Sequence, residues 1–178
     1  EVFKYLFSDE VWGNVLRNID VITADNMKNN HGATIFYYLC ENQQNVEVFK
    51  YLFSQEVWGN VLRNIDVITA DNMKDYNGDT IFHVLCCNQQ NVEVFKYLFS
   101  EEVWGNVLRN IDVITADNMK DNNGATIFHA LCANQQNVEV FKYLFSVDVW
   151  GNRLRIYDVI SADNMKNNNG DTIFTYLC

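Results

Sequence analysis

The chain has 178 residues, of which 48% are hydrophobic and 20% are charged, and it contains no proline. A chain of this length buries roughly 70% of its unfolded surface, so a sizeable core is expected. The 23 acidic residues outnumber the 13 basic ones and give a net charge of −10. This charge argues against a nucleic-acid partner and favours a basic or mixed protein surface, and no apolar run approaches the roughly 20 residues of a membrane span.

An eight-residue segment that begins at Glu1 returns unchanged at Glu47, Glu93 and Glu139, always 46 positions further along the chain. A period of this size indicates stacked units of secondary structure, each of which buries its apolar face on its neighbours. We therefore expect residues 1–178 to form a single repeat array, with units that start at 1, 47, 93 and 139 and a truncated last unit.

Each unit is predicted to contain a pair of helices. Residues 122–124 form an Asn-Asn-Gly turn signal, and Thr126 follows at the position of a helix N-cap. The apolar residues of segment 127–132 then give the first helix a broad hydrophobic face. Asn137 is expected to cap the second helix, with Glu139 in its first turn, where a negative charge suits the helix dipole.

A third, shorter helical segment is predicted in every unit. In the third unit Ser100 is expected to cap it, and apolar residues then recur at helical spacing. Gly105 lowers the helix propensity by about 1 kcal/mol, so the segment is predicted to be short or distorted. Residues 112–120 are expected to form an irregular connection, in which residues 113–115 are compatible with a brief extended piece.

Three segments of the unit resemble the ankyrin-repeat family. Residues 75–83 read Asp-Tyr-Asn-Gly-Asp-Thr-Ile-Phe-His and resemble the ankyrin signature D-x-x-G-x-T-P-L-H. Residues 92–99 resemble the second ankyrin helix, and residues 70–75 loosely resemble the run that leads into the ankyrin turn. These matches recur in register and cover about two thirds of the chain. The resemblance implies an intracellular protein that binds other proteins.

The chain departs from the ankyrin pattern in several ways. Ankyrin units have about 33 residues, so roughly 13 per unit are additional, and they align with the tryptophan-containing segment. Gln-Gln-Asn replaces Gly-His in the turn between the helices, and isoleucine replaces the family proline at Ile35, Ile81, Ile127 and Ile173. The expected fold is an all-α repeat solenoid of stacked ankyrin-like helix pairs with an inserted third short helix per repeat. A HEAT- or armadillo-like solenoid, with a period of about 40–47 residues, is the alternative.

Two histidines are each followed by a cysteine three residues later, a spacing that could supply ligands to a zinc ion. His83 with Cys86, and His129 with Cys132, are pairs at i and i+3, which share a helix face. Neighbouring helices lie roughly 8–10 Å apart, whereas zinc requires all its ligands at about 2.0–2.3 Å from one ion. We therefore expect buried thiols beside structural histidines. No phosphate-binding loop or nucleophile motif is present, so no catalytic, cofactor or metal site is predicted, and the protein is expected not to be an enzyme.

Other residues recur once per unit. Cysteine recurs at Cys40, Cys86, Cys132 and Cys178, and Cys87 is an additional residue. A secreted disulfide scaffold would be shorter, so reduced thiols and a cytoplasmic location are expected. The chain opens directly in the repeat pattern, without a signal peptide. Packing in the core or between repeats is predicted for Trp12, Trp58, Trp104 and Trp150. A solvated face is predicted for Lys4, Lys50, Lys96 and Lys142.

The positions that differ between units concentrate in the turns and the first helices. In ankyrin proteins these segments line the face that contacts partners, so the resemblance implies a protein-binding surface here; free drift of solvent-exposed positions is the other explanation. The predicted partner-binding residues are Asn30, His31, Ala33, Tyr37, Tyr76, Asn77, Asp79, His83, Asn122, Asn123, Ala125, Asn168, Asn169 and Asp171.

Both ends of the chain fall inside a helix pair, and neither carries the polar cap that stacked repeats need. The ends are therefore expected to associate head to tail. The predicted function is a non-enzymatic protein–protein interaction module that uses turn tips and first helices. The alternative is a structural spacer or self-stacking rod without a specific ligand.

Overall fold

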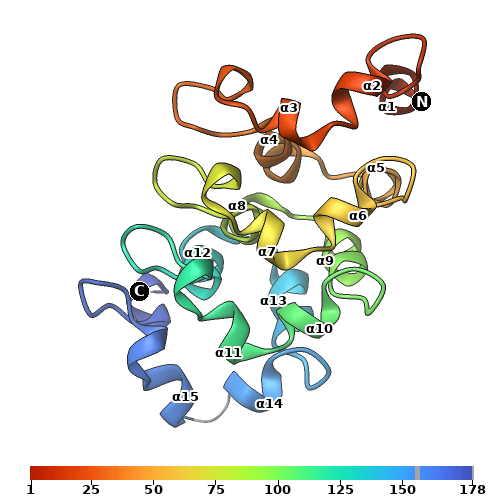
Figure 1. The fold of residues 1–178 in the computed structure, drawn as a ribbon. Helices are drawn as coiled ribbons and strands as arrows, with labels where there is room; N and C mark the ends of the chain where they lie inside the picture. The colour runs from red at the N-terminus through yellow and green to blue at the C-terminus, as the bar shows by residue number, and fades with distance from the viewer. Residues whose placement is uncertain (155–156, 178) are drawn as a thin grey trace.

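The computed structural model describes residues 1–154 and 157–177, and Cys178 lies outside the described residues. Every regular element in these two ranges is helical, which confirms the predicted all-α class. Within the same ranges, no helix combines the length and the apolar character needed to cross a bilayer. Successive units follow one another along the molecule from the N-terminal to the C-terminal end (Figure 1).

The predicted helix pair is present in the units. The Oδ1 atom of Asn91 accepts a hydrogen bond of 3.0 Å from the backbone N–H of Glu93, and Asn137 caps the last pair in the same way. Thr80 and Thr126 are the N-caps of their helices, as expected. The first helices are α4 (Ile35–Asn42), α8 (Ile81–Asn88) and α12 (Ile127–Asn134), and the second helices are α1 (Val2–Leu6), α5 (Val46–Leu52), α9 (Val92–Leu98) and α13 (Val138–Leu144).

The prediction for the third segment is wrong in two respects. Ser100 does not cap a helix, because the chain first makes turns in which the Ser100 carbonyl accepts from the N–H of Gly105 at 2.8 Å. The expected extended piece around residues 113–115 is helical, since the Asn110 side chain caps a further turn by accepting from Asp112 N–H at 3.1 Å. Each unit thus carries two short helices where one was expected.

The first of these short helices begins at its glycine in each unit. A Cβ atom at Gly105 would lie 2.5 Å from the carbonyl oxygen of Phe99, so only glycine fits this approach of the two backbones. The short helices are α2 (Gly13–Leu16), α3 (Ile19–Ile22), α6 (Gly59–Leu62), α7 (Ile65–Ile68), α10 (Gly105–Leu108), α11 (Ile111–Ile114), α14 (Gly151–Leu154) and α15 (Tyr157–Ser161). Single 3-10 turns complete the units at η1 (Asp25–Met27), η2 (Asp71–Met73), η3 (Asp117–Met119), η4 (Asp163–Met165) and η5 (Ile173–Tyr176).

Equivalent helices of neighbouring units pack against one another. Helix α8 contacts α4 on one side and α12 on the other, and α9 lies between α5 and α13 in the same way. The core between them is apolar and includes three fully buried tryptophans, Trp58, Trp104 and Trp150. Packing was the predicted role of these three side chains, and burial confirms it, whereas Trp12 is 57% exposed at the N-terminal end.

Amide side chains join the turns between the paired helices. The Nε2 of Gln89 donates to the Gln43 carbonyl at 2.7 Å, and Gln135 donates in turn to the Gln89 carbonyl at 2.8 Å. Gln89 and Gln135 are buried, so each hydrogen bond satisfies a side-chain amide donor that is shielded from water. The Gln-Gln-Asn sequence that separates this chain from the ankyrin pattern therefore serves as a polar ladder between units.

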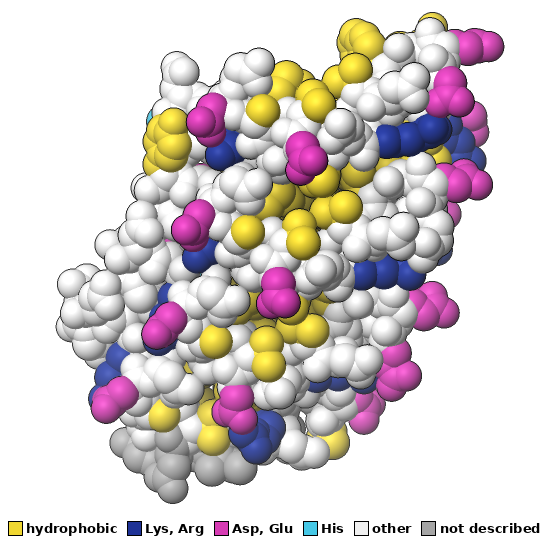
Figure 2. Space-filling view, in the orientation of Figure 1, with side chains coloured by type: hydrophobic (Ala, Val, Ile, Leu, Met, Phe, Trp, Pro, Cys, Tyr) yellow, Lys and Arg dark blue, Asp and Glu magenta, His cyan; other side chains and the backbone are white. Residues whose placement is uncertain are grey.

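The lysine ladder lies on the surface, as predicted. Lys50, Lys96 and Lys142 each pair with the glutamate three residues earlier at 2.6 to 2.7 Å, and these side chains are largely exposed. Such solvent-exposed pairs contribute little to stability, about 0–1 kcal/mol each. Figure 2 shows acidic, basic and hydrophobic surface alternating in a similar pattern from one layer to the next.

Candidate functional site

The candidate site is the surface formed by the turns before the first helices together with those helices. We call residues 29–33, 75–79, 121–125 and 167–171 the turn tips, and the turn tips with α4, α8 and α12 the tip face. In the second tip one Asp75 oxygen accepts from the N–H groups of Asn77 and Asp79, both at 2.9 Å. Gly78 supplies the φ of +80° that closes the turn.

Backbone hydrogen bonds connect each turn tip to the next. The Tyr76 N–H donates to the His31 carbonyl at 2.8 Å, and the Asn122 N–H donates to the Asn77 carbonyl at 2.9 Å. The same bond recurs in the last tip, and the Asn122 side chain adds a bond of 2.9 Å to the Tyr76 carbonyl. The tips are therefore held in a row at a fixed spacing.

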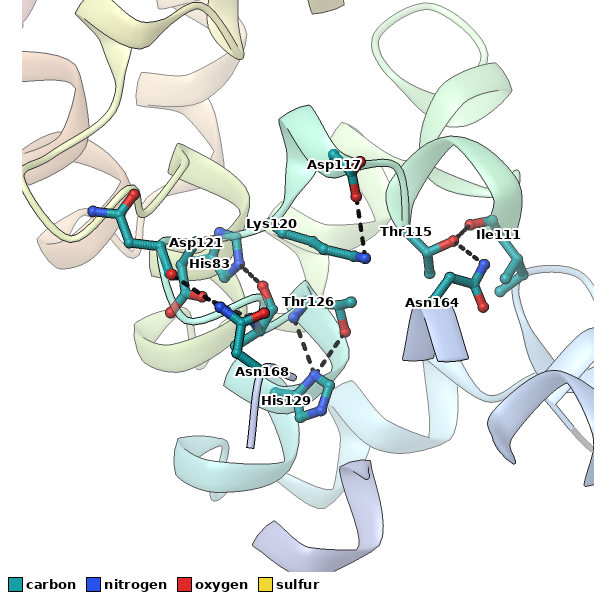
Figure 3. A network of polar contacts seen from close by, with 12 residues as sticks. His83, Ile111, Thr115, Asp117, Lys120, Asp121, Thr126, His129, Asn164 and Asn168 are labelled. Carbon is teal, nitrogen blue, oxygen red and sulfur yellow. Dashed lines mark hydrogen bonds and ion pairs between the residues drawn. The ribbon is translucent and has the colours of Figure 1, made fainter. Parts of the chain in front are cut away.

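Two histidines tie the first helices to the following tips. In His83, Nδ1 accepts from the Thr80 N–H at 3.2 Å, and Nε2 lies 3.0 Å from the Ala125 carbonyl of the next unit. A carbonyl only accepts, so Nε2 carries the proton and the ring is neutral. His129 repeats this arrangement with Thr126 (Figure 3) and with the Asp171 carbonyl at 3.1 Å. The structural role expected for the histidines agrees with these bonds.

Acidic side chains gather around a shallow hollow of about 220 Å³ between the second and third units. Asp79 and Asp121 line it together with Cys87, Asn134 and Tyr176. Burial raises the pKa of Asp79 to about 6, and the negative charges of Asp75 and Asp121 act in the same direction. The hollow therefore disfavours a further negative charge and suits a cationic side chain.

The cysteines of the tip face are poor nucleophiles. Burial raises the pKa of Cys87 to about 11, although a hydrogen bond of 3.3 Å from Asn134 Nδ2 opposes the shift. Cys40, Cys86 and Cys132 are buried free thiols, as the sequence predicts, and burial raises the pKa of each of them as well. Only the thiolate attacks electrophiles, so these protonated groups are packing residues. In the described ranges no three His, Cys, Asp or Glu side chains gather at metal-binding distance.

The predicted partner-binding residues differ in accessibility. Ala33 and His83 are buried, and the His83 ring is committed to the neighbouring unit, so neither offers side-chain surface to a partner. Half-buried positions are Tyr37, Asp79, Ala125 and Asp171. Exposed positions are Asn30, His31, Tyr76, Asn77, Asn122, Asn123, Asn168 and Asn169.

Sequence reasoning left out several residues of the hollow. Asp121, Asn134 and Tyr176 were not singled out, since they follow Asp79 by 42, 55 and 97 residues in the sequence. A partial signal was present, because His83 and Cys87 are four residues apart on α8 and share a helix face, and Asp79 directly precedes the N-cap of that helix. The residues that the next unit supplies to the hollow follow only from the packing of the two units against each other.

No family model matches the sequence, and no curated protein matches it.

Proposed function

We propose that the chain is an ankyrin-like solenoid that binds a partner protein through its tip face. The bonds between equivalent residues of successive units support the repeat arrangement, since the tips, the glutamine ladder and the histidines each repeat one contact from unit to unit.

The observation that carries this proposal is the contrast between fixed backbones and variable side chains along the tips. The tip backbones are held by hydrogen bonds of 2.8 to 2.9 Å, and the side chains at the second and third positions of each tip are exposed. Six of these eight residues are asparagine, and His31 and Tyr76, which is 72% exposed, are the two that differ. A rigid row of exposed aromatic and polar side chains costs little entropy to bind, which favours specific contacts.

The chemistry of the hollow indicates the kind of partner. Asp79 and Asp121 both line the hollow, and the chain as a whole has a net charge of −10. A lysine or arginine side chain of the partner would pair with these two carboxylates, and the exposed Tyr76 in the same turn tip as Asp79 offers a further contact. We therefore expect a partner with a basic surface segment.

A quantitative pull-down tests the proposal. The double variant Tyr76→Ala/Asp79→Ala removes the exposed ring and one carboxylate, and the matched control Lys96→Ala/Lys142→Ala changes two exposed side chains on the second helices. Proteins enriched by the wild type should be lost with the first variant and kept with the second, and their binding should weaken with salt because the contact is ionic. A spacer without a ligand would give the same protein set for all three chains, and that result would refute the proposal.

A further inference from the structure

The hollow between the second and third units is lined on its third-unit side by small side chains. Ala125, Ala130 and Ala133 all contribute to its wall. The other units carry larger residues at the last two of these positions, namely Tyr38, Val84 and Tyr176 in place of Ala130, and Glu41 and Cys87 in place of Ala133. The hollow is therefore open because the third unit has methyl groups where its neighbours have longer side chains.

A tyrosine covers the first residue of the turn tip in two other units. The Asn29 amide donates to the Tyr38 hydroxyl at 2.5 Å, and the Asn167 amide donates to the Tyr176 hydroxyl at 3.0 Å. In the third unit the asparagine is replaced by Asp121 and the tyrosine by an alanine. The third unit thus turns a carboxylate toward the hollow where the outer units have an amide that is already bonded to a phenol.

The two carboxylates of the hollow have free acceptor oxygens. One oxygen of Asp121 accepts from the N–H groups of Asn123 and Ala125 at 2.9 and 2.7 Å. Among the residues that the structure describes, the second oxygen of Asp121 and both carboxylate oxygens of Asp79 have no hydrogen-bond or ion-pair partner. A partly buried carboxylate without a partner is unfavourable, so the hollow favours a positively charged donor.

Neither the two histidines nor the adjacent lysine supplies this donor. His83 and His129 are neutral, because the Nε2 of each ring lies 3.0 to 3.1 Å from a carbonyl of the next unit and carries the ring proton. Lys120 extends toward Asp117, with which it pairs at 3.3 Å, and away from Asp121 (Figure 3). The positive charge that the hollow favours must therefore come from another molecule.

The junction between the first and second units shows what such a place accepts. Tyr37, which holds the position of His83 in the first unit, is half-buried there near Asp75, Asp79 and Glu41. Burial raises the pKa of Tyr37, and these negative charges act in the same direction, so its hydroxyl stays protonated and remains a donor. The chain itself thus places a donor among the carboxylates of one junction and leaves the next junction open.

A guanidinium group suits the hollow better than an ammonium group. The two carboxylates come from different units, and a planar guanidinium carries five N–H donors that can serve both of them at once. An ammonium group is a compact and strongly hydrated charge, which is costlier to bring into a partly buried place. The methylene groups of an arginine can also pack on the alanine side chains of the wall.

We infer that the hollow anchors a single arginine side chain of the partner, and that Ala130 and Ala133 determine this specificity by keeping the hollow open. The inference rests on the proposed role of the tip face in binding a protein. The arginine donates to Asp79 of the second unit and to Asp121 of the third, so it recognises the junction of these two units and not a single repeat.

Nuclear magnetic resonance titration of the 178-residue chain with three peptides tests this pocket. The probes are acetyl-Gly-Gly-Arg-Gly-Gly-amide and the same peptide with lysine or citrulline in place of arginine; citrulline keeps the shape of arginine but has no charge. The arginine peptide should shift the amide resonances of Asp79, Cys87, Asp121 and Ala130. The lysine peptide should bind about tenfold more weakly, and the citrulline peptide should leave these resonances unchanged.

Substitutions taken from the other units close the hollow. The double variant Asp121→Asn/Ala130→Tyr introduces the pair that the first unit has at Asn29 and Tyr38, so it should fold, as circular dichroism checks, and should bind the arginine peptide at least about tenfold more weakly. Ala130→Val, which introduces the residue of the second unit, should weaken binding with both carboxylates kept. Asn123→Ala changes an exposed side chain of the same turn tip and should bind like the wild type.

Two results would overturn the inference. One is equal binding of the arginine and citrulline peptides, and the other is unchanged binding of the arginine peptide by both Asp121→Asn/Ala130→Tyr and Ala130→Val. The pull-down separates this failure from failure of the proposed function. A protein set that is lost with Tyr76→Ala/Asp79→Ala but kept with Asp121→Asn/Ala130→Tyr would support the proposed function and overturn the arginine pocket. An empty pull-down beside specific binding of the arginine peptide would overturn the proposed function and support the pocket.

Discussion

The indole Nε1–H of Trp104 donates a hydrogen bond of 2.6 Å to the backbone carbonyl of Leu62, which belongs to the preceding unit. Both residues are buried, so this bond satisfies a donor and an acceptor that water does not reach. It joins the short helix α6 to the start of α10, and it recurs at every inner junction. The inserted segment, which has no counterpart in a 33-residue unit, therefore takes part in the packing between units.

Trp104→Phe should destabilise the protein by about 1–3 kcal/mol, because it leaves the Leu62 carbonyl buried without its donor while most of the ring packing remains. Urea unfolding followed by circular dichroism measures the loss. Trp12→Phe is the matched control, since Trp12 is exposed at the N-terminal end and its change should alter stability by less than about 0.5 kcal/mol at low protein concentration. Equal effects of the two substitutions would show that the indole bond contributes nothing.

Gly105→Ala should destabilise the chain even though alanine favours helix by about 1 kcal/mol. The added methyl group would lie 2.5 Å from the Phe99 carbonyl oxygen and within 2.8 Å of Ser100 backbone atoms, so the two segments must separate. We expect a net loss of about 1–3 kcal/mol. Asn106→Ala changes an exposed position in the same helix and serves as the control. A stabilised Gly105→Ala protein would contradict the close approach.

The free energy of unfolding should depend on pH through His83 and Asp79, which act in opposite directions. Burial lowers the pKa of His83 from 6.5, so in acid the unfolded state binds the proton more readily than the folded state. The contribution of His83 to the free energy of unfolding is therefore complete above about pH 6.5 and is lost as the pH falls toward the lowered value. Asp79 has a pKa raised to about 6, so the folded state takes up its proton first and gains stability as the pH falls through that value.

Two variants separate these contributions in urea unfolding at pH 5 to 7. Asp79→Asn removes the opposing carboxylate, so its stability should fall more steeply with acid than that of the wild type. Adding His83→Gln removes one titrating ring and should reduce that slope, and the remainder is expected from His129, whose pKa is also lowered by burial. A slope that His83→Gln leaves unchanged would assign the pH dependence to other groups.

Cys87 should react slowly with iodoacetamide in the folded protein. A pKa of about 11 in place of 9.0 leaves roughly a hundredfold less thiolate at pH 8, and only the thiolate reacts. Peptide mass spectrometry should therefore find Cys87 alkylated far more slowly than in urea, with the rate rising about tenfold per pH unit up to pH 10. Fast labelling at pH 8 would mean that Asn134 lowers the pKa more than burial raises it.

The helix pair follows from local chemistry, and so it was predictable. Thr80 and Asn91 cap their helices through bonds to N–H groups two residues away, which depend only on adjacent sequence. The 46-residue period also required packing between units, because one unit alone cannot bury its apolar face. The prediction for segment 100–114 was wrong because Ser100 and Gly105 are compatible both with a capped helix and with a turn. The local sequence alone does not decide between these two conformations.

The accessible part of the tip face was decided by the tertiary structure. His83 and Tyr76 both vary between units, yet one is buried against Ala125 and the other is 72% exposed. The hollow beside Asp79 exists because Asp121, 42 residues away, is brought next to it by stacking. The sequence by itself determined the paired helices and their caps, since these arise from interactions over a few residues, and the repeat length, which is printed in the sequence. Only the packed units decided which variable side chains face solvent and which carboxylates share a site, because both depend on contacts between residues about one repeat apart.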